Sequence, residues 1–183
     1  MLTGAALGAL ELRQQDGGVR LRGRFPYAAE AELAPGRSER IEPRAFAARI
    51  EAGGEIHLLA GHDFNRPLAS REAGTLTLRD TSEALEIEAT LAEGTSWARD
   101  FLEAHRAGLI RGLSPGFRVP PGGERIERRG DGILRRITSA ELFEISAVTL
   151  PAYPAAQVEA RSWAPGREGP DAGLVRAMQR WRL

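Results

Sequence analysis

The chain consists mostly of short segments in which apolar and polar residues alternate. Turn residues separate these segments. Alternation with a period of two is typical of strands with one buried face, whereas a helix repeats every 3.6 residues. Gly-rich turns at Asp16-Gly17-Gly18 and Gly130-Asp131-Gly132 each join two such segments. The pattern therefore predicts a mostly antiparallel β protein, with strands at residues 9–14, 19–25, 56–61, 75–79, 85–91, 124–128, 133–138 and 142–150.

Two segments predict helices. Residues 43 to about 51 carry Pro43 at a first-turn position, where proline is favoured. The second segment covers residues 96 to about 107, with Thr95 or Ser96 as the cap residue. Within this second helix, one stripe faces a core through Trp97, Phe101 and His105.

The length of 183 residues predicts one domain of ordinary size. The composition changes after Pro154, and residues 162–173 contain five Pro or Gly residues. We therefore expect one domain at residues 1–160, followed at residues 161–183 by a linker and a short amphipathic tail. A frayed tail and a partner-binding helix are equally compatible with this tail.

The composition excludes several classes of function. The chain has 25 Arg, no Lys and 25 acidic residues, so it lacks the excess of positive charge expected of a nucleic-acid binder. The absence of Cys excludes disulfides, zinc fingers and a cysteine nucleophile. Apolar runs are short and the N-terminus lacks a signal peptide, so we expect a soluble intracellular protein without a membrane segment.

Histidine is scarce, since only His57, His62 and His105 are present. None of their spacings matches a pair of zinc ligands at i and i+4. We therefore expect no metal and no cofactor.

Ser114 lies in a Gly-Leu-Ser-Pro-Gly segment that formally matches the G-x-S-x-G nucleophile elbow. Two observations exclude an α/β-hydrolase. No histidine follows His105, so no base can come after Ser114 in the chain order of that fold. Pro115 also lacks the N–H that the elbow uses to bind the oxyanion. A base for Ser114 must therefore come from upstream.

His62 is the candidate base, because it ends an apolar run predicted to be a buried strand and precedes a polar stretch. A structural or capping histidine is the alternative. By strand parity we expect His57 to lie on the opposite face from His62, in a structural or exposed position. His105 is expected to pack on its helix.

Glu144 lies in the last predicted strand, whose two faces are both largely apolar, as in a central strand. A carboxylate buried there requires a cation or a strong donor. His62 could provide it and would then be oriented by Glu144. A salt bridge to Arg135 or Arg136 is equally compatible with the strand.

Five blocks of the sequence resemble the prohead maturation proteases of tailed phages, which are distant relatives of the herpesvirus assemblins. In chain order the blocks are VRLRGRFPYA around Gly23, ERIEPRAF at 39–46, LLAGHDFNRPLA at 58–69, GLIRGLSPGF at 108–117 and ELFEISAVTLPAYP at 141–154. The compact chain, rich in Ala and Arg, is also similar to the version that bacterial gene transfer agents encode.

This resemblance implies an α+β fold with a closed, mainly antiparallel β-barrel surrounded by helices. It implies a serine endopeptidase that works in the cytoplasm inside the immature capsid. The expected substrates are the scaffold, the N-terminal segment of the major capsid protein, and the protease itself, which could also form a homo-oligomer. Matched by motif, His62 is the base, Ser114 the nucleophile and Glu144 the orienting acid.

The chain departs from the family pattern at two positions. Pro115 replaces a β-branched residue, and Ala69 replaces a Gly. Pro115 leaves the oxyanion donor open among the Gly116 amide, another loop amide and Arg118. Pro115 is also compatible with a second interpretation, in which the protein is a non-catalytic assembly or scaffold-binding factor with the same fold. A third interpretation is a small esterase.

Overall fold

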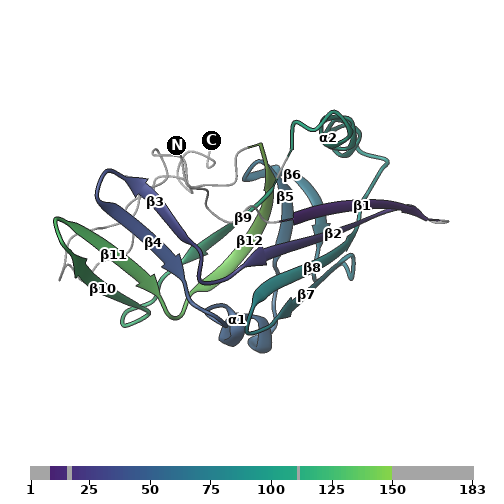
Figure 1. Cartoon of the computed structure of the whole chain (residues 1–183). Coiled ribbons are helices and arrows are strands. Elements are labelled where there is room, and N and C mark those ends of the chain that lie inside the picture. The colour runs from purple at the N-terminus through teal and green to yellow at the C-terminus, as the bar shows by residue number, and fades with distance from the viewer. Residues whose placement is uncertain (1–8, 16–17, 111, 150–183) are drawn as a thin grey trace, which may run out of the picture.

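Strands dominate the computed structural model, which describes residues 9–15, 18–110 and 112–149 (Figure 1). Sheet I contains, in spatial order, β1 (Ala9–Gln15), β2 (Gly18–Pro26), β8 (Ala84–Thr90) and β7 (Leu76–Asp80). Sheet II contains β10 (Glu124–Arg129), β11 (Gly132–Ile137), β4 (Arg37–Ile41) and β3 (Glu30–Ala34). Sheet III contains β6 (Asp63–Ser70), β5 (His57–Ala60), β12 (Glu141–Val148) and β9 (Gly112–Arg118).

The prediction of a mostly antiparallel protein is confirmed, because the described strand pairs are antiparallel except for β4 with β11 and β5 with β12. The predicted hairpins β1–β2 and β10–β11 are also present. Asp16, Gly17, the predicted strand end at Leu150 and the whole linker and tail at 161–183 lie outside the described residues.

The expected closed barrel surrounded by helices is wrong. Within the described residues, the strands form three open sheets, each with two edge strands. A barrel closes only when every edge strand finds a hydrogen-bonded partner. Strand β9 instead packs against β2 without forming a ladder, and Gly23 on β2 leaves room there for the Leu113 side chain.

Two helices are described. Helix α2 (Ser96–Arg106) matches its prediction, and its cap residue Thr95 accepts a hydrogen bond from the Ala98 backbone N–H. Helix α1 (Ala47–Ala52) begins later than predicted, because Arg44 adopts a positive φ of 60° that interrupts a helix. Figure 1 shows α1 and α2 at separate places on the molecule, so they do not enclose the strands.

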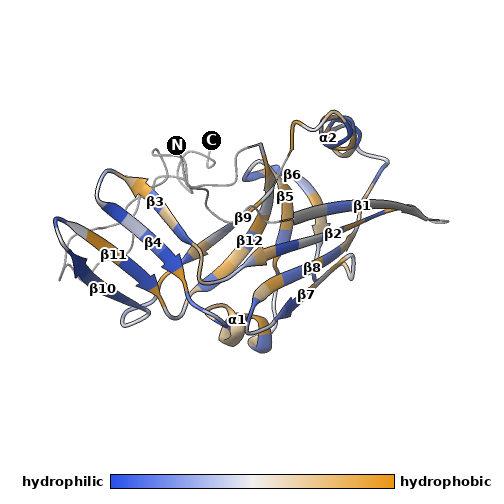
Figure 2. Cartoon of the chain, in the orientation of Figure 1, coloured by the Kyte–Doolittle hydropathy of each residue, from blue (hydrophilic) through white to orange (hydrophobic). Residues whose placement is uncertain are grey.

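The hydrophobic core is formed by the inward faces of the strands together with α2. Hydrophilic and hydrophobic positions alternate along many strands (Figure 2), as expected where one face is buried. Helix α2 contributes Phe101 and Leu102, while Trp97 lies at the border of the core and donates from its indole N–H to the Pro67 carbonyl at 2.8 Å. Fully buried strand residues include Leu21, Leu58, Leu68, Leu85, Ile137, Leu142 and Ile145.

Four strands were not predicted, namely β3, β4, β6 and β9. Strand β4 reads as polar, but its Glu39 is buried and forms a 3.1 Å ion pair with the buried Arg135. Strands β6 and β9 each contain a proline, which lacks the N–H that a ladder needs. Both are edge strands of sheet III, where a missing N–H is tolerated.

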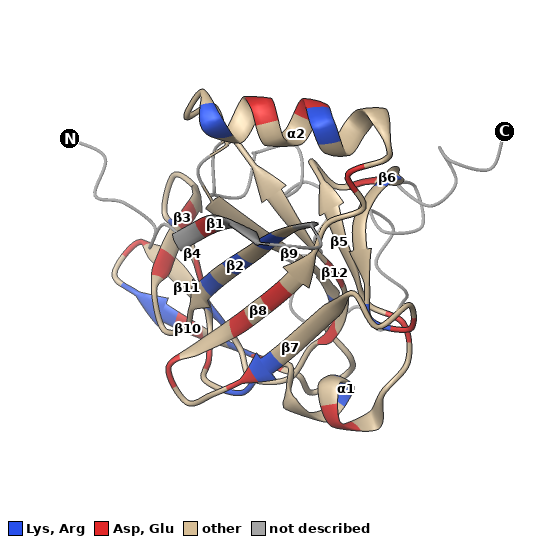
Figure 3. Ribbon diagram, turned by 90° about the vertical axis from the view of Figure 1, so that its right-hand side faces the viewer, with Lys and Arg blue, Asp and Glu red and all other residues tan. Residues whose placement is uncertain are grey.

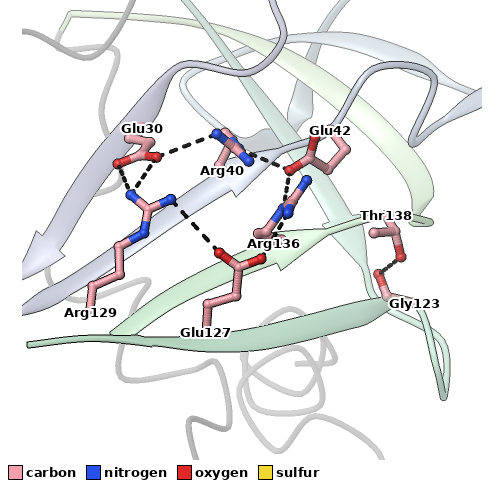
Figure 4. A network of polar contacts seen from close by, with 8 residues as sticks. All are labelled: Glu30, Arg40, Glu42, Gly123, Glu127, Arg129, Arg136 and Thr138. Carbon is pink, nitrogen blue, oxygen red and sulfur yellow. Dashed lines mark hydrogen bonds and ion pairs between the residues drawn. The ribbon is translucent and has the colours of Figure 1, made fainter. Parts of the chain in front are cut away.

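Charged side chains form ion pairs across the solvent-facing surfaces of two sheets. On sheet I, acidic and basic residues alternate across β2, β8 and β7 (Figure 3), with Arg22 and Glu88 joined at 3.1 Å. On sheet II, glutamates and arginines of four strands and the following turns form a continuous network (Figure 4). These pairs cover polar strand faces and lie on different sheets from the candidate site.

Candidate active site

Strand β12 is the central element of the candidate site. It pairs with β5 on one side and β9 on the other, so the prediction of a central strand is confirmed. A bulge between Leu142 and Glu144 changes the alternation, so that Leu142, Ile145 and Ala147 all reach the core. Glu144 and Ser146 therefore share the other face of the strand.

His62 occupies the two-residue turn that joins β5 to β6. Ala60 and Asp63 pair across this turn, and both central residues, Gly61 and His62, have positive φ, of 68° and 62°. Such turns match the twist of antiparallel strands and favour Gly, Asn or Asp, and a positive φ is uncommon for any residue other than glycine. Because His62 lies beyond the strand, strand parity does not determine where its ring points.

The imidazole of His62 contacts the carboxylate of Glu144. Nδ1 of His62 lies 2.7 Å from Oε1 of Glu144, whose side chain is 5% exposed. When Glu144 is ionised it can only accept a hydrogen bond, and in that state Nδ1 carries the proton and Nε2 of a neutral ring keeps its lone pair. The site thus holds an oriented imidazole with one nitrogen able to accept a proton.

The alternative partners for Glu144 are engaged elsewhere. Arg135 binds Glu39 and Glu124, and Arg136 binds Glu42 and Glu127. Both arginines lie in sheet II, whereas the carboxylate of Glu144, in sheet III, pairs with His62.

Ser146 is a member of this cluster that the sequence reasoning missed. Its hydroxyl donates to Glu144 Oε2 at 2.7 Å and accepts from the His62 backbone N–H at 2.8 Å. The available signal was its position two residues after Glu144, which places both side chains on one face of a strand.

Ser114 lies on β9 directly opposite Ser146 on β12. Directly opposite residues in an antiparallel pair lie about 4.5–5.5 Å apart at Cα and project to the same face. Ser114 therefore shares the face of Glu144 and Ser146, and it is 7% exposed. No hydrogen bond joins the described Ser114 and His62, a contact that in enzymes without substrate is often long.

Gly116 lies opposite Glu144 in the same register. A β-carbon at Gly116 would overlap the Glu144 carboxylate and lie 2.7 Å from its Cδ. Because Gly116 has no side chain, the Glu144 side chain can extend over β9 at this position.

Neither Pro115 nor Arg118 is a suitable oxyanion donor beside Ser114. Pro115 has no N–H. The guanidinium of Arg118 binds Glu141 at 2.5 Å and lies over the ring of Phe143. Since Arg118 follows Ser114 by four residues in an extended strand, their Cα atoms are also about 13 Å apart.

The other two histidines lie outside this contact. His57 pairs in register with Glu144, which puts both side chains on the same face of sheet III. Because the His62 ring contacts Glu144 on that face, the prediction that His57 lies on the opposite face from His62 is wrong. Its ring packs edge-on against Phe64, and its buried Nδ1 has no partner among the described residues. His105 packs against Phe101 on α2, as predicted.

The described residues contain no group of three or more His, Cys, Asp or Glu side chains arranged to hold a metal ion. Helices α1 and α2 are too short to cross a bilayer. A surface depression of about 510 Å³ is lined by charged residues of sheet I and not by the cluster on sheet III.

Comparison with known protein families gives a match that spans residues 8–167, to the caudovirus prohead serine proteases. Because this match covers most of the chain, the protein belongs to that family of serine proteases, which act in the maturation of phage capsids. Comparison with curated proteins and with solved structures gave no match.

Proposed function

We propose that this chain is a serine endopeptidase in which Ser114 is the nucleophile, His62 the general base and Glu144 the residue that orients the base. The single observation that supports this assignment best is the 2.7 Å contact between His62 Nδ1 and Glu144 Oε1. The position of Ser114 opposite Ser146, on the same face as Glu144, is the second support.

The reaction follows from these roles. Ser114 Oγ attacks the carbonyl carbon of the scissile peptide bond, and His62 Nε2 takes the hydroxyl proton. The resulting imidazolium is stabilised by the Glu144 carboxylate and then gives its proton to the leaving amine, as the C–N bond breaks. Water then attacks the acyl-enzyme carbonyl carbon while His62 Nε2 takes one of its protons. The ester bond to Ser114 Oγ breaks, the imidazolium returns the proton to Oγ, and the carboxylic acid product leaves. The first step requires Ser114 Oγ and His62 Nε2 to come into hydrogen-bond contact.

The oxyanion needs a backbone donor in this scheme. Because Pro115 has no N–H and Arg118 is paired with Glu141, the Gly116 amide or another loop amide is the remaining candidate.

The proposed substrates are the scaffold and the N-terminal segment of the major capsid protein, cleaved inside the assembling prohead. Membership of the prohead protease family supports capsid-related substrates in general. Self-processing and self-association are part of the same proposal, and terminal sequencing of the mature protein tests the former. We further propose that residues 1–160 form the protease domain, and that a chain ending at residue 160 keeps its reactivity.

A serine-directed fluorophosphonate reagent tests this function. We expect labelling of the full-length protein at Ser114, located by mass spectrometry, and none in Ser114→Ala. The absence of labelling in every assembly state would instead favour the non-catalytic, scaffold-binding factor.

A further inference from the structure

Ser146 is the most buried polar group of the candidate site, with no exposed surface. It is not part of the Ser114, His62 and Glu144 set, and the reaction above assigns it no step. Its hydroxyl nevertheless contacts two of these three residues. The hydroxyl is buried, and it uses its proton on Glu144 and a lone pair on the backbone of His62. Such an arrangement calls for an explanation.

The first of these contacts holds the carboxylate. Glu144 Oε1 faces His62, while Oε2 accepts the Ser146 hydroxyl proton at 2.7 Å. With both oxygens engaged, the carboxylate cannot rotate about its last bond without breaking a charge-assisted hydrogen bond in a buried setting. Gly116 lies against the same carboxylate from β9.

The second contact holds the backbone of the base. The N–H of His62 donates to Ser146 Oγ at 2.8 Å, and the N–H of the preceding Gly61 donates to the Ala147 carbonyl at 3.1 Å. His62 has a positive φ, which is unfavourable for a residue with a side chain and persists only where the surroundings hold it. Ser146 thus anchors the turn that carries the base to the strand that carries the acid.

We propose that Ser146 is a positioning residue that locks His62 and Glu144 into one rigid unit, an inference that rests on the proposed function. It touches neither the substrate nor the reacting atoms. Its effect is to keep the imidazole aimed at Ser114, since a displacement of about 1 Å in such a group can lower a rate by about 100-fold.

The first test compares Ser146→Ala with a matched control. Ser70→Ala removes a hydroxyl that also donates to a glutamate, Glu55, at 2.7 Å and also lies in sheet III, but outside the site. The probe is an alkyl fluorophosphonate, with the maximal labelling rate and the half-saturating concentration measured separately. We expect Ser146→Ala to lower the maximal rate about 10- to 100-fold with little change in half-saturation. Ser70→Ala should change neither.

The second test is spectroscopic. A proton held between His62 Nδ1 and Glu144 should give a downfield imidazole resonance in the proton NMR spectrum of the full-length protein. We expect this resonance to move upfield or broaden in Ser146→Ala and to stay in place in Ser70→Ala. A purely structural role of Ser146 would lower the melting temperature without moving this resonance in the folded variant.

A third pair of variants covers the case in which Ser146→Ala does not fold. Ser146→Thr and Ser146→Val have nearly the same shape, so any damage to packing is shared, and they differ in the hydroxyl. The threonine variant should label at least about 10-fold faster than the valine variant. Equal rates in the two variants would overturn the role of Ser146.

The outcomes also separate this inference from the proposed function. A wild-type protein that does not react with the probe overturns both. A wild-type protein that reacts at Ser114, together with Ser146→Ala reacting at the same rate, overturns only the role of Ser146.

Discussion

Gly116 on β9 and Glu144 on β12 lie directly opposite each other, and the Glu144 carboxylate occupies the space in which a side chain at Gly116 would lie. Glu144 cannot move aside freely, because its two oxygens bind His62 and Ser146. Any side chain at position 116 therefore competes with the contact that orients the candidate base.

The first prediction follows from this overlap. Gly116→Ala should lower the fluorophosphonate labelling rate by about 100-fold and destabilise the fold by about 1–3 kcal/mol, the range for an overpacked core. Gly94→Ala is the matched control, since nothing lies within 4 Å of a β-carbon at Gly94 and it should leave both quantities nearly unchanged. Equal labelling rates for the two variants would show that Glu144 does not need its present position.

Ser114→Ala and His62→Ala should each lower peptide-bond cleavage by about three to six orders of magnitude, leaving only the rate supplied by substrate binding and the oxyanion site. The double variant should be no slower than either single one, because residues that act as a unit are not additive. Cleavage of the major capsid protein, followed by gel electrophoresis and mass spectrometry, measures this. Wild-type cleavage by Ser114→Ala would refute the nucleophile assignment.

Glu144→Gln keeps the size of the side chain but removes its charge. The amide cannot stabilise an imidazolium as a carboxylate does, so we expect a loss of about two to four orders of magnitude in the maximal cleavage rate. Substrate affinity should stay within a few-fold of the wild type. A variant that lost affinity instead of rate would place Glu144 in the substrate-binding site.

The buried pair Glu39 and Arg135 should dominate the stability of sheet II. Glu39→Ala leaves a buried guanidinium without one of its partners, and the free energy of unfolding should fall by about 3–5 kcal/mol. Replacing Glu39 and Arg135 together by Met and Leu should recover most of this loss, because no buried charge remains. Urea denaturation measures both variants. The exposed pair Arg24 and Glu83 is the control, with an expected effect of about 1 kcal/mol or less for Arg24→Ala.

The network on sheet II also predicts how stability depends on pH (Figure 4). Burial opposes ionisation of Glu42, but hydrogen bonds from Arg136 and Arg40 outweigh it, so the pKa of Glu42 is lowered. The stability that this carboxylate contributes is present above the ordinary glutamate pKa of about 4.3, and it is lost as the pH falls through the lower folded-state pKa. Melting temperatures between neutral and acidic pH should therefore fall less steeply in Glu42→Gln than in the wild type.

Asp80 should show the opposite sign. Burial raises its pKa, and the hydrogen bond from the Tyr27 hydroxyl at 2.6 Å does not fully offset this. A group whose folded-state pKa is raised loses its stabilising contribution as the pH rises through that value. The melting temperature of Asp80→Asn should therefore rise relative to that of the wild type as the pH increases toward neutral. A difference between the two melting temperatures that does not change with pH would contradict a raised pKa of Asp80.

Much of the β structure was predictable from alternation alone. Strands such as β2 and β8 bury one face in the core, so their period-two alternation appears in the sequence. Strands β4 and β9 were missed because their residues are polar or turn-forming. Only their partners explain them: Arg135 neutralises Glu39 on β4, and the edge position of β9 tolerates Pro115.

The candidate site divides in the same way. Scarcity of histidine and a carboxylate in an apolar strand identified His62 and Glu144, and the structure brings them into contact. Ser146 was missed although it follows Glu144 by two residues on the same strand face, because only the structure shows that its hydroxyl contacts both Glu144 and the His62 backbone. The number and closure of the sheets could not be derived either, since these depend on which edge strands meet.

Residue order by itself determined the strand periodicity, the lack of thiol chemistry and the two residues able to form a base and its acid. These follow from chemistry that each residue carries wherever it lies. The tertiary structure decided the three open sheets, the opposition of Ser114 and Ser146, and the closeness of Gly116 to Glu144. These relationships join residues from 28 positions apart, as for Gly116 and Glu144, to 96 positions apart, as for Arg37 and Ile133. Only ladder register and packing between strands can set them.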